Sequence, residues 1–383
     1  MNISSKLPNV GTNIFSTMSA LANEYGAINL SQGFPDFDCP EELQERVNFH
    51  LKNGKNQYAP MAGVPILRER LAKKMEKPYG TRINPDTEIT ITAGATQALF
   101  TAITAFIHLG DEVILIEPAY DSYRPAIELT GGVPVIYELH GPDYQIDWER
   151  FGKLISNKTK MIVINTPHNP IGKVRSEEDM QALEKFTNGT DILVLSDEVY
   201  EHLIYDGKKH QSVLRFPALF KRSLLVYSFG KTFHCTGWKM GYCVAPELLM
   251  REFRKVHQFN VFSCNSFVQY GIADYLENPE TYQQLPDFYQ QKRDFFQKEL
   301  VGSALKPLAS EGSYFQLYDY SAISDLGDKE FAKYLTTEIG VAVIPVSAFY
   351  SSGRDENVVR FCFAKKEETL AAAGRLLRRR DDS

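Results

Sequence analysis

The sequence predicts an α/β protein whose large domain holds a mostly parallel, seven-stranded sheet flanked by helices. Seven short runs rich in Val, Ile and Leu follow one another through the middle of the chain. Nearly continuous apolar runs are typical of strands buried on both faces. Longer segments with helical character separate several of them, and this alternation predicts a parallel sheet. The runs lie at residues 88–93, 112–117, 133–138, 160–165, 191–197, 223–228 and 240–245.

Segments 96–108 and 176–186 are the clearest helices between these strands. The last two runs differ from the others, because the link from Ser228 to Met240 is too short for a crossover helix. A parallel return usually needs a dozen or more connecting residues. We therefore predict that the strand at 240–245 is antiparallel to its neighbours.

The two ends of the chain differ from its middle. Residues 1–45 contain several Pro and Gly residues, which predict an arm with little regular structure. An amphipathic helix is expected at 284–300 and a final helix at 365–380, whose basic end suits a helix C-terminus. A solvent-facing surface explains those terminal arginines better than nucleic-acid binding does. Three further strands are expected at 313–320, 341–347 and 358–364.

These terminal segments predict a smaller α/β domain formed by both chain ends. We expect an N-terminal arm and part of the small domain at 1–45, the large domain at 46–284, and the C-terminal small domain at 285–383. The length of 383 residues suits two or three domains, since domains usually hold roughly 100–200 residues.

Composition excludes several classes of protein. Hydrophobic residues make up 43% and aromatic residues 12%, which is too apolar for disorder. The net charge of −6 disfavours nucleic-acid binding. The five cysteines are odd in number, widely spaced and without a CxxC pair, which argues against a disulfide framework or a zinc site, so no metal is expected. Without a signal-like N-terminus or an 18-residue apolar run, we expect a soluble cytoplasmic protein with no membrane contact.

The segment SFGKTFHCTGWKMGY at 228–242 is the most informative stretch. Its GKT at 230–232 could end a phosphate-binding Walker motif, but that motif needs Gly where position 225 is Leu. The alternative is a nucleophilic Lys231, because a lysine just past a buried strand loses water and its amine is freed for Schiff-base chemistry. Lys239 and Ser228 could then hold a phosphate. Taken alone, Lys231 is better explained as a solvated surface lysine, as most lysines are.

Other polar residues follow neighbouring strands. Asp197 ends the 191–197 run, where α/β sheets collect ligands, and a buried carboxylate there needs a cation or hydrogen bonds. A protonated pyridine nitrogen is a suitable partner, and Tyr200 lies three residues on. Asn165 and Asn169 in INTPHNPIG follow another strand as neutral donors.

Two more segments complete the series. AGATQALF at 93–100 reads as a strand, a small-residue turn and a helix whose first N–H groups would face an anion. Tyr120 in EPAYDSY follows a further strand and could stack on a flat ring. Each motif has a purely structural interpretation as a turn, a helix start or a core aromatic. Those structural interpretations do not explain why all of these motifs stand at strand ends.

Together these motifs resemble the pyridoxal-phosphate-dependent aminotransferases of fold type I, class I/II. The resemblance extends from SQGFPDF at 31–37 to VVRFCFA at 358–364. Within that group, EPAYDSY at 117–123 and IPVSAFY at 344–350 resemble the methionine and the kynurenine–glutamine aminotransferases.

The resemblance implies roles for individual residues toward pyridoxal 5′-phosphate. Lys231 would link covalently to the cofactor and act as the base, and Asp197 would keep the pyridine nitrogen protonated. Tyr200 and Asn169 would hydrogen-bond the ring oxygen, and Tyr120 would stack on the ring.

The phosphate and the substrate would have their own residues. The phosphate would be bound by Ser228, Lys239, and the backbone at Ala95 and Thr96. The α-carboxylate of the substrate would pair with Arg360, whose planar fork suits it. Gly33, Asn169, Phe15 and Phe349 would complete the substrate site.

Tyr58 resembles a tyrosine that reaches the phosphate of a neighbouring subunit, which implies a homodimer with shared active sites. The expected activity is transfer of the amino group of an apolar or aromatic L-amino acid (methionine, phenylalanine, tyrosine, kynurenine or glutamine type) to a 2-oxo acid, in a ping-pong scheme. No second arginine can be placed opposite Arg360, although Arg124 follows Tyr120 closely.

Two alternatives remain open from the sequence. The same machinery could eliminate from Cβ, as in a cysteine-conjugate carbon–sulfur β-lyase. A non-enzymatic cofactor-binding regulator is disfavoured, because the resemblance begins by residue 31 and leaves little room for a DNA-binding domain.

Overall fold

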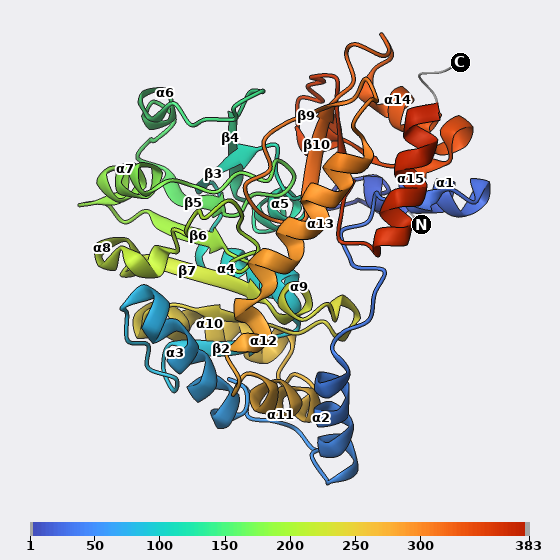
Figure 1. Ribbon diagram of the computed structural model, residues 1–383. Coiled ribbons are helices and arrows are strands. Elements are labelled where there is room, and N and C mark those ends of the chain that lie inside the picture. Colours follow the sequence, from blue (N-terminus) through green and yellow to red (C-terminus); the bar gives the residue numbers. More distant parts are fainter. Residues whose placement is uncertain (1–2, 380–383) are drawn as a thin grey trace.

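The computed structural model describes residues 3–379 and holds a seven-stranded sheet in its larger part (Figure 1). The strand order is β2-β8-β7-β6-β5-β3-β4, and all neighbours are parallel except around β8, which is antiparallel to both β2 and β7. The strands are β2 (Ile89–Thr92), β3 (Glu112–Glu117), β4 (Val133–Glu138), β5 (Thr159–Asn165), β6 (Leu193–Asp197), β7 (Ser223–Ser228) and β8 (Gly241–Val244). The fold class is thereby confirmed, together with the antiparallel strand expected at 240–245.

The link before β8 explains this reversal. It holds only α9 (Phe229–Thr232) and η2 (Thr236–Trp238), which together cannot cross the sheet and return on the same edge. The chain therefore turns back beside β7, and the residues of the turn stay at the carboxyl end of that strand.

The sheet is buried on both faces, which is why its strands are almost wholly apolar. Ile114 and Ile116 of β3 pack into one hydrophobic cluster, while Val113 and Leu115 pack into a second one. Successive side chains of a strand point to opposite faces, so both faces need apolar residues when helices cover both.

Helices surround the sheet (Figure 1). α4 packs on β7 and β8, and α10 packs on α4. In the central part of the chain the helices are α2 (Glu41–Lys52), α3 (Pro65–Tyr79), α4 (Gly94–Phe106), α5 (Tyr123–Leu129), α6 (Trp148–Gly152), α7 (Glu177–Thr187), η1 (Val213–Arg215), α8 (Pro217–Phe220), α10 (Glu247–Asn260), α11 (Ser266–Tyr275) and α12 (Glu280–Gln283).

A smaller, antiparallel sheet follows with the order β12-β13-β10-β9. Its strands are β9 (Lys306–Pro307), β10 (Phe315–Asp319), β12 (Ile344–Pro345) and β13 (Val358–Cys362). The remaining helices of this part are α13 (Leu285–Glu299), α14 (Asp328–Tyr334), η3 (Leu335–Ile339), η4 (Val346–Phe349) and α15 (Glu367–Arg379). Arg380, the last residue of the final predicted helix, lies outside the described residues.

The two ends of the chain meet. β1 (Ile28–Asn29) pairs in parallel with β11 (Val341–Ala342), and α1 (Ile14–Tyr25) packs against β11. Figure 1 shows α1 and α15 on the same side of the molecule. This agrees with a smaller part built from both ends, while the boundaries at residues 45 and 284 stay predictions.

The prediction of an arm with little regular structure was wrong for residues 14–25. The Asn13 side chain accepts a hydrogen bond from the Ser16 backbone N–H at 2.8 Å and starts α1, while Gly26 ends it with φ +62°. Met18 and Ala22 are buried against the rest of the chain. Tertiary packing of a short apolar stripe therefore outweighs the signal of the surrounding prolines.

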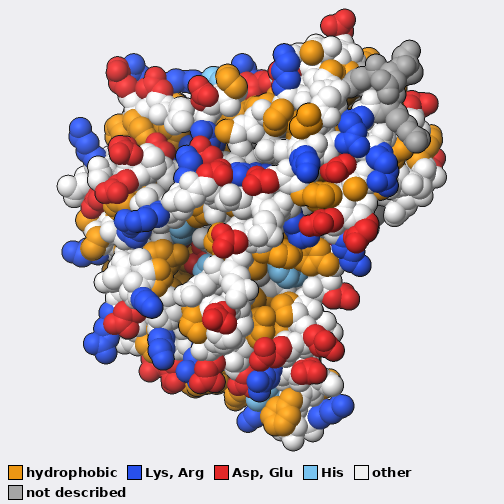
Figure 2. All heavy atoms as spheres, in the orientation of Figure 1, with side chains coloured by type: hydrophobic (Ala, Val, Ile, Leu, Met, Phe, Trp, Pro, Cys, Tyr) orange, Lys and Arg blue, Asp and Glu red, His pale blue; other side chains and the backbone are white. Residues whose placement is uncertain are grey.

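The surface carries interspersed acidic and basic side chains on the face shown in Figure 2. Among residues 3–379, no helix is both long and apolar enough to cross a membrane.

One glycine is essential for packing at the edge of the sheet. Gly63 has φ +98°, and a Cβ built on it would lie 2.2 Å from Cγ1 of the buried Ile91. Gly54 also has a positive φ, +83°, but a Cβ there would meet nothing within 4 Å. A substitution at Gly54 therefore causes backbone strain alone, while a substitution at Gly63 causes backbone strain and steric overlap.

We predict that Gly63→Ala lowers the free energy of unfolding more than Gly54→Ala does. Both variants place a side chain in the left-handed region, at a cost of about 1–2 kcal/mol, and Gly63→Ala adds overpacking of about 1–3 kcal/mol. Urea midpoints at constant m-value measure the difference. Equal losses would show that Ile91 moves aside freely.

Candidate functional site

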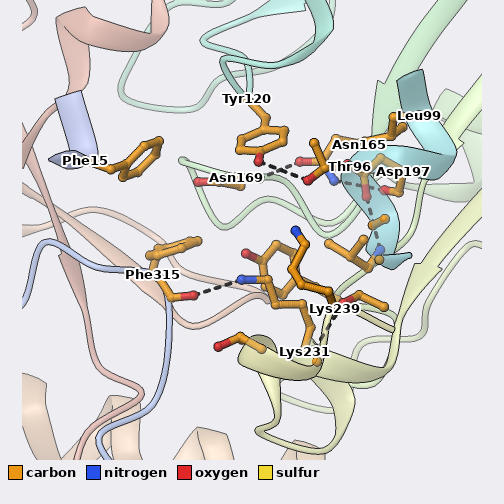
Figure 3. Close-up of a pocket in the computed structure, with 18 of the residues that line it drawn as sticks. Phe15, Thr96, Leu99, Tyr120, Asn165, Asn169, Asp197, Lys231, Lys239 and Phe315 are labelled. Carbon is orange, nitrogen blue, oxygen red and sulfur yellow. Dashed lines mark hydrogen bonds between the residues drawn. The ribbon is translucent and has the colours of Figure 1, made fainter. Parts of the chain in front are cut away.

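A cavity of about 300 Å³ opens between the carboxyl ends of the large sheet and the small sheet. Figure 3 shows Lys231 and Lys239 extending into it, with Tyr120, Asn169 and Asp197 across from them. The predicted residues that line it are Phe15, Gly33, Ala95, Thr96, Tyr120, Asn169, Asp197, Tyr200, Ser228, Lys231, Lys239 and Arg360. Tyr58 and Phe349 do not line it. The fold thus brings together residues that are far apart in sequence.

Lys231 enters the cavity from the turn after β7. The Ser228 hydroxyl accepts from the Lys231 backbone N–H at 3.3 Å and starts α9 there. The Lys231 Nζ donates to the Gly33 carbonyl at 2.8 Å and to the Tyr314 hydroxyl at 2.7 Å. Loss of water lowers the pKa of Lys231 to about 8, and the nearby Arg360 charge adds to this effect. A substantial fraction of the amine is therefore neutral at mildly basic pH.

Asp197 ends β6 and is 4% exposed. The Tyr123 hydroxyl donates to its Oδ2 at 2.6 Å, and the Val199 backbone N–H donates to Oδ1 at 3.3 Å. Burial raises the pKa of Asp197 to about 6, although the Tyr123 hydrogen bond and the Lys231 charge oppose this. Its direct hydrogen-bond partners among the described residues are neutral, so a cationic ring nitrogen in the cavity would complete the site.

The N-terminus of α4 forms one end of the cavity. Ala93 provides no side-chain cap, so the first N–H groups at Gly94, Ala95 and Thr96 are free of one. A Cβ on Gly94 would lie 3.6 Å from the Lys239 Nζ, which shows how close this cation is to the helix start. A helix N-terminus, an ammonium and the Ser228 hydroxyl together suit a phosphate group.

Gly241 lets the strand β8 approach this helix start. A Cβ on Gly241 would lie 2.6 Å from the Tyr227 carbonyl oxygen and 2.9 Å from the Ala95 nitrogen. A larger residue at position 241 would overlap with the backbone of Ala95 and displace the start of α4.

Several neutral groups line the middle of the cavity. Tyr120 and Thr96 share a hydroxyl–hydroxyl hydrogen bond of 3.3 Å. Asn165 donates to the Asp197 backbone carbonyl at 2.9 Å and accepts from the Asn169 backbone N–H at 2.7 Å. Asn165 thus links the Asn169 backbone to the Asp197 backbone through two hydrogen bonds that add no charge to the cavity.

Arg360 lies on β13 with no exposed surface. Its Nη1 donates to the Asn169 Oδ1 at 2.8 Å, its Nη2 donates to the Ser31 carbonyl at 2.8 Å, and its buried Nε has no partner among the described residues. Burial lowers the pKa of Arg360 to about 10. A buried guanidinium with neutral partners and a free N–H is well suited to bind a substrate carboxylate.

Aromatic rings surround that guanidinium. Its Cζ lies 3.8 Å from the centroid of Phe315, 5.3 Å from that of Phe15 and 5.2 Å from that of Phe349. Phe349 is buried and backs Phe15 at a ring distance of 5.9 Å, so it supports the pocket from behind. The surroundings of Arg360 are therefore apolar.

Two residues considered from the sequence lie away from the cavity. Tyr58 is 83% exposed and its ring packs edge-on against Phe262 at 5.3 Å. Arg124 pairs with Glu128 at 2.8 Å on the surface, so it does not face Arg360 across the cavity.

Sequence reasoning missed Tyr123, Tyr314 and Phe315. Tyr123 stands in the same EPAYDSY segment as Tyr120, and its place three residues further on is the signal that could have found it. Tyr314 and Phe315 precede and begin a strand of the small sheet, and their contact with Lys231 and Arg360 depends on how the two sheets pack.

Comparison with known proteins gives a consistent result. The family described as aminotransferase class I and II matches residues 25–376. The methionine aminotransferase of Escherichia coli K12 is 52% identical over 375 residues, which cover 98% of this chain and 97% of that protein. The human kynurenine–oxoglutarate transaminase 1 is 35% identical over 395 residues, which cover 94% of this chain and 93% of that protein.

Solved structures agree with these relatives. A structure of an Escherichia coli methionine aminotransferase superposes with a TM-score of 0.97 at 52% identity and covers 99% of this chain and all of that one. The N-succinyldiaminopimelate aminotransferase of Mycobacterium tuberculosis gives a TM-score of 0.94 at 32% identity, covering 99% of this chain and all of that one.

The buried Asp197 should destabilise the cofactor-free protein when it is ionised. Its pKa rises from 3.8 to about 6 on folding, so the penalty is absent below about pH 4, grows between about pH 4 and 6, and is complete above that. We predict that Asp197→Asn stabilises the cofactor-free protein by about 3 kcal/mol near pH 7, which is the size of this shift in free energy.

Urea unfolding of wild type and variant across this pH range measures the effect. The exposed Asp191, just before the same strand, provides the control Asp191→Asn, which should change stability little at any pH. A wild-type-to-variant difference that does not depend on pH would show that Asp197 is not the group responsible.

Proposed function

The chain belongs to the class I and II aminotransferase family, and from this premise we propose that it transfers the amino group of an apolar or aromatic L-amino acid, methionine foremost, to a 2-oxo acid. It is a pyridoxal-phosphate-dependent aminotransferase. The proposal of an apolar or aromatic substrate rests mainly on one observation. Arg360 faces the same cavity as Lys231 and Asp197, and the rings of Phe15, Phe315 and Phe349 surround it.

That surrounding favours an apolar substrate side chain. A carboxylate bound by Arg360 places the rest of the amino acid among aromatic rings, where methyl, thioether and phenyl groups gain contact area. A dicarboxylate would need a second cation, and Arg124 does not line the cavity. The named relatives act on methionine and kynurenine, which agrees with this proposal.

The residues of the cavity fit the cofactor from end to end. We propose that the α4 N-terminus, Ser228 and Lys239 hold its phosphate, that Asp197 pairs with its ring nitrogen, and that Tyr120 stacks on its ring. Tyr200 and Asn169, which line the same cavity, would bind the ring oxygen. When bound, pyridoxal phosphate supplies an aldehyde that condenses with amines and a ring that delocalises the negative charge left at the substrate Cα.

Lys231 is the proposed base. Its Nζ, with a pKa near 8, takes the proton from the substrate Cα and holds it for return in the later step. The Gly33 carbonyl and the Tyr314 hydroxyl orient this amine in the structure. Arg360 orients the substrate by its carboxylate, so that the Cα–H bond faces Lys231. The product 2-oxo acid of the donor leaves before the acceptor 2-oxo acid enters, which is a ping-pong order.

We propose a homodimer in which Tyr58 reaches the active site of the partner. Tyr58, Phe259 and Phe262 are large, exposed aromatic residues from neighbouring segments, with Tyr58 and Phe262 in ring contact. Exposed aromatic clusters mark interaction surfaces. We also propose the cytoplasm as the location, because all five cysteines are free and four of them are buried thiols.

The carbon–sulfur lyase alternative is not favoured, since the most similar named proteins are transaminases. The regulator alternative fails because the chain is an enzyme of this family.

We predict that Lys231→Ala lowers kcat for the methionine-to-2-oxo-acid reaction by about 10³-fold or more, because a positioned base alone contributes about 10²–10⁴-fold. Steady-state assay of the 2-oxo acid product measures this. Lys221→Ala, which removes an exposed lysine just before β7, is the control and should keep full activity. Normal turnover by Lys231→Ala would refute the assignment.

We predict that Arg360→Lys lowers kcat/KM for methionine and for phenylalanine by a similar factor of about 10–100. A lysine loses the planar fork that binds both carboxylate oxygens, and a charge-assisted hydrogen bond is worth about 1.5–3 kcal/mol. The control Arg124→Lys should leave both values unchanged. A loss confined to one of the two amino acids would mean that Arg360 reads the side chain and not the carboxylate.

A further inference from the structure

A second cavity, of about 1160 Å³, lies apart from the active site among α3, the segment after β6, and the α11–α12 region. These helices lie together in the lower part of Figure 1. The cavity is larger than the first one and shares no lining residue with it. Nothing in the aminotransferase reaction uses it.

The cavity wall has an excess of positive charge. Its cations are Arg70, Lys73, Lys74, Lys77, Lys209 and Arg215, and its carboxylates are Glu76, Glu201 and Glu277. Two of the cations are paired: Lys74 contacts Glu201 at 2.5 Å and Arg70 contacts Glu277 at 2.8 Å.

Lys73, Lys77, Lys209 and Arg215 make no ion pair within the described part of the chain. Only Glu76 remains on the wall to balance them. In a protein with a net charge of −6, this is a local reversal of sign.

One residue of the cavity wall, His210, is held by a buried carboxylate. The His210 side chain is 7% exposed and its Nε2 lies 2.8 Å from the Glu198 Oε2. Glu198 is fully buried and also accepts hydrogen bonds from Tyr227 and Ser196, at 3.0 and 2.9 Å, so its oxygens are occupied.

The other nitrogen of His210, Nδ1, is buried and unpartnered among the described residues. His210 is thus held by Glu198 through Nε2 and is one of the residues that line the cavity.

A second histidine lines the same cavity. His202 Nε2 lies 3.4 Å from the Glu201 Oε1, and its ring packs on Tyr282 at 5.0 Å. The rings of Tyr79 and Tyr282 complete the wall. The cavity therefore combines unpaired cations with flat apolar surfaces.

We propose that this cavity is a second binding site, which takes a small phosphate-bearing anion. Lysine ammonium groups bind phosphate as point charges, and several of them around one cavity favour a multiply charged group over a single carboxylate. The aromatic walls give room for an organic part beside the phosphate. The proposal is independent of which amino acid the active site prefers.

Inorganic pyrophosphate is the probe, titrated by calorimetry into the enzyme loaded with pyridoxal phosphate. The loaded form is required, because the cofactor then fills the phosphate-binding end of the active site. We expect saturable binding of one pyrophosphate per chain that weakens as KCl is raised.

The variant Lys73→Gln/Lys77→Gln removes two unpaired cations of α3 from the cavity wall. We expect it to weaken pyrophosphate binding by about tenfold or more, since each lost charge-assisted contact is worth at least about 1.5 kcal/mol. Aminotransferase activity should be unchanged. The matched control Lys306→Gln/Lys333→Gln removes two exposed lysines elsewhere and should bind as the wild type does.

Three outcomes would overturn the proposal. No saturable binding to the wild type would exclude the site. Equal weakening in both double variants would mean that only the overall charge matters. If citrate binds in the same cavity more tightly than pyrophosphate does, the site prefers carboxylates to phosphates.

Discussion

The site depends on one constraint: Asp197 and Lys231 are both withdrawn from water in the same cavity, yet they form no direct ion pair with each other. Burial raises the pKa of Asp197 to about 6 and lowers that of Lys231 to about 8, so each is moved toward neutrality. Direct pairing would undo both shifts. Each group has a neutral hydrogen-bond partner, because the Tyr123 hydroxyl donates to Asp197 and the Tyr314 hydroxyl accepts from Lys231.

The contacts of Lys231 and Arg360 show why residues from both ends of the chain are needed to build this cavity. Gly33 from the N-terminal segment accepts from Lys231, and Arg360 from β13 donates to the Ser31 carbonyl of that segment. Lys365 donates to the Phe34 carbonyl at 2.7 Å, which ties residues 31–34 to the C-terminal part once more. The N-terminal segment is thus held between Lys231, the proposed base, and Arg360, the proposed carboxylate-binding residue.

The sequence predicted the large sheet well, because its information is local. Each strand is a short apolar run, and the short link before β8 forced the antiparallel turn. Asp197, Lys231 and Asn169 could be found for the same reason. Asp197 ends β6, Lys231 lies three residues after β7, and Asn169 lies four residues after β5. Strand ends converge at one edge of a sheet. Tyr314 and Phe315 could not be found in this way. Tyr314 contacts Lys231, 83 positions away, and Phe315 contacts Arg360 on another strand of the small sheet. Apolar patterning contains no information about contacts of that kind. The helix α1 was missed for a related reason, since its buried face is only completed by β11 and η3.

The short segment from Asp197 to Glu201 contributes residues to the walls of both cavities. Asp197 and Tyr200 line the active-site cavity, while Glu201 lines the second cavity and Glu198 lies between His210 and Tyr227. The negative charge of Glu198 is one of the causes that raise the pKa of Asp197. The carboxylate of Asp197 is thus next in sequence to a buried carboxylate whose charge opposes its ionisation.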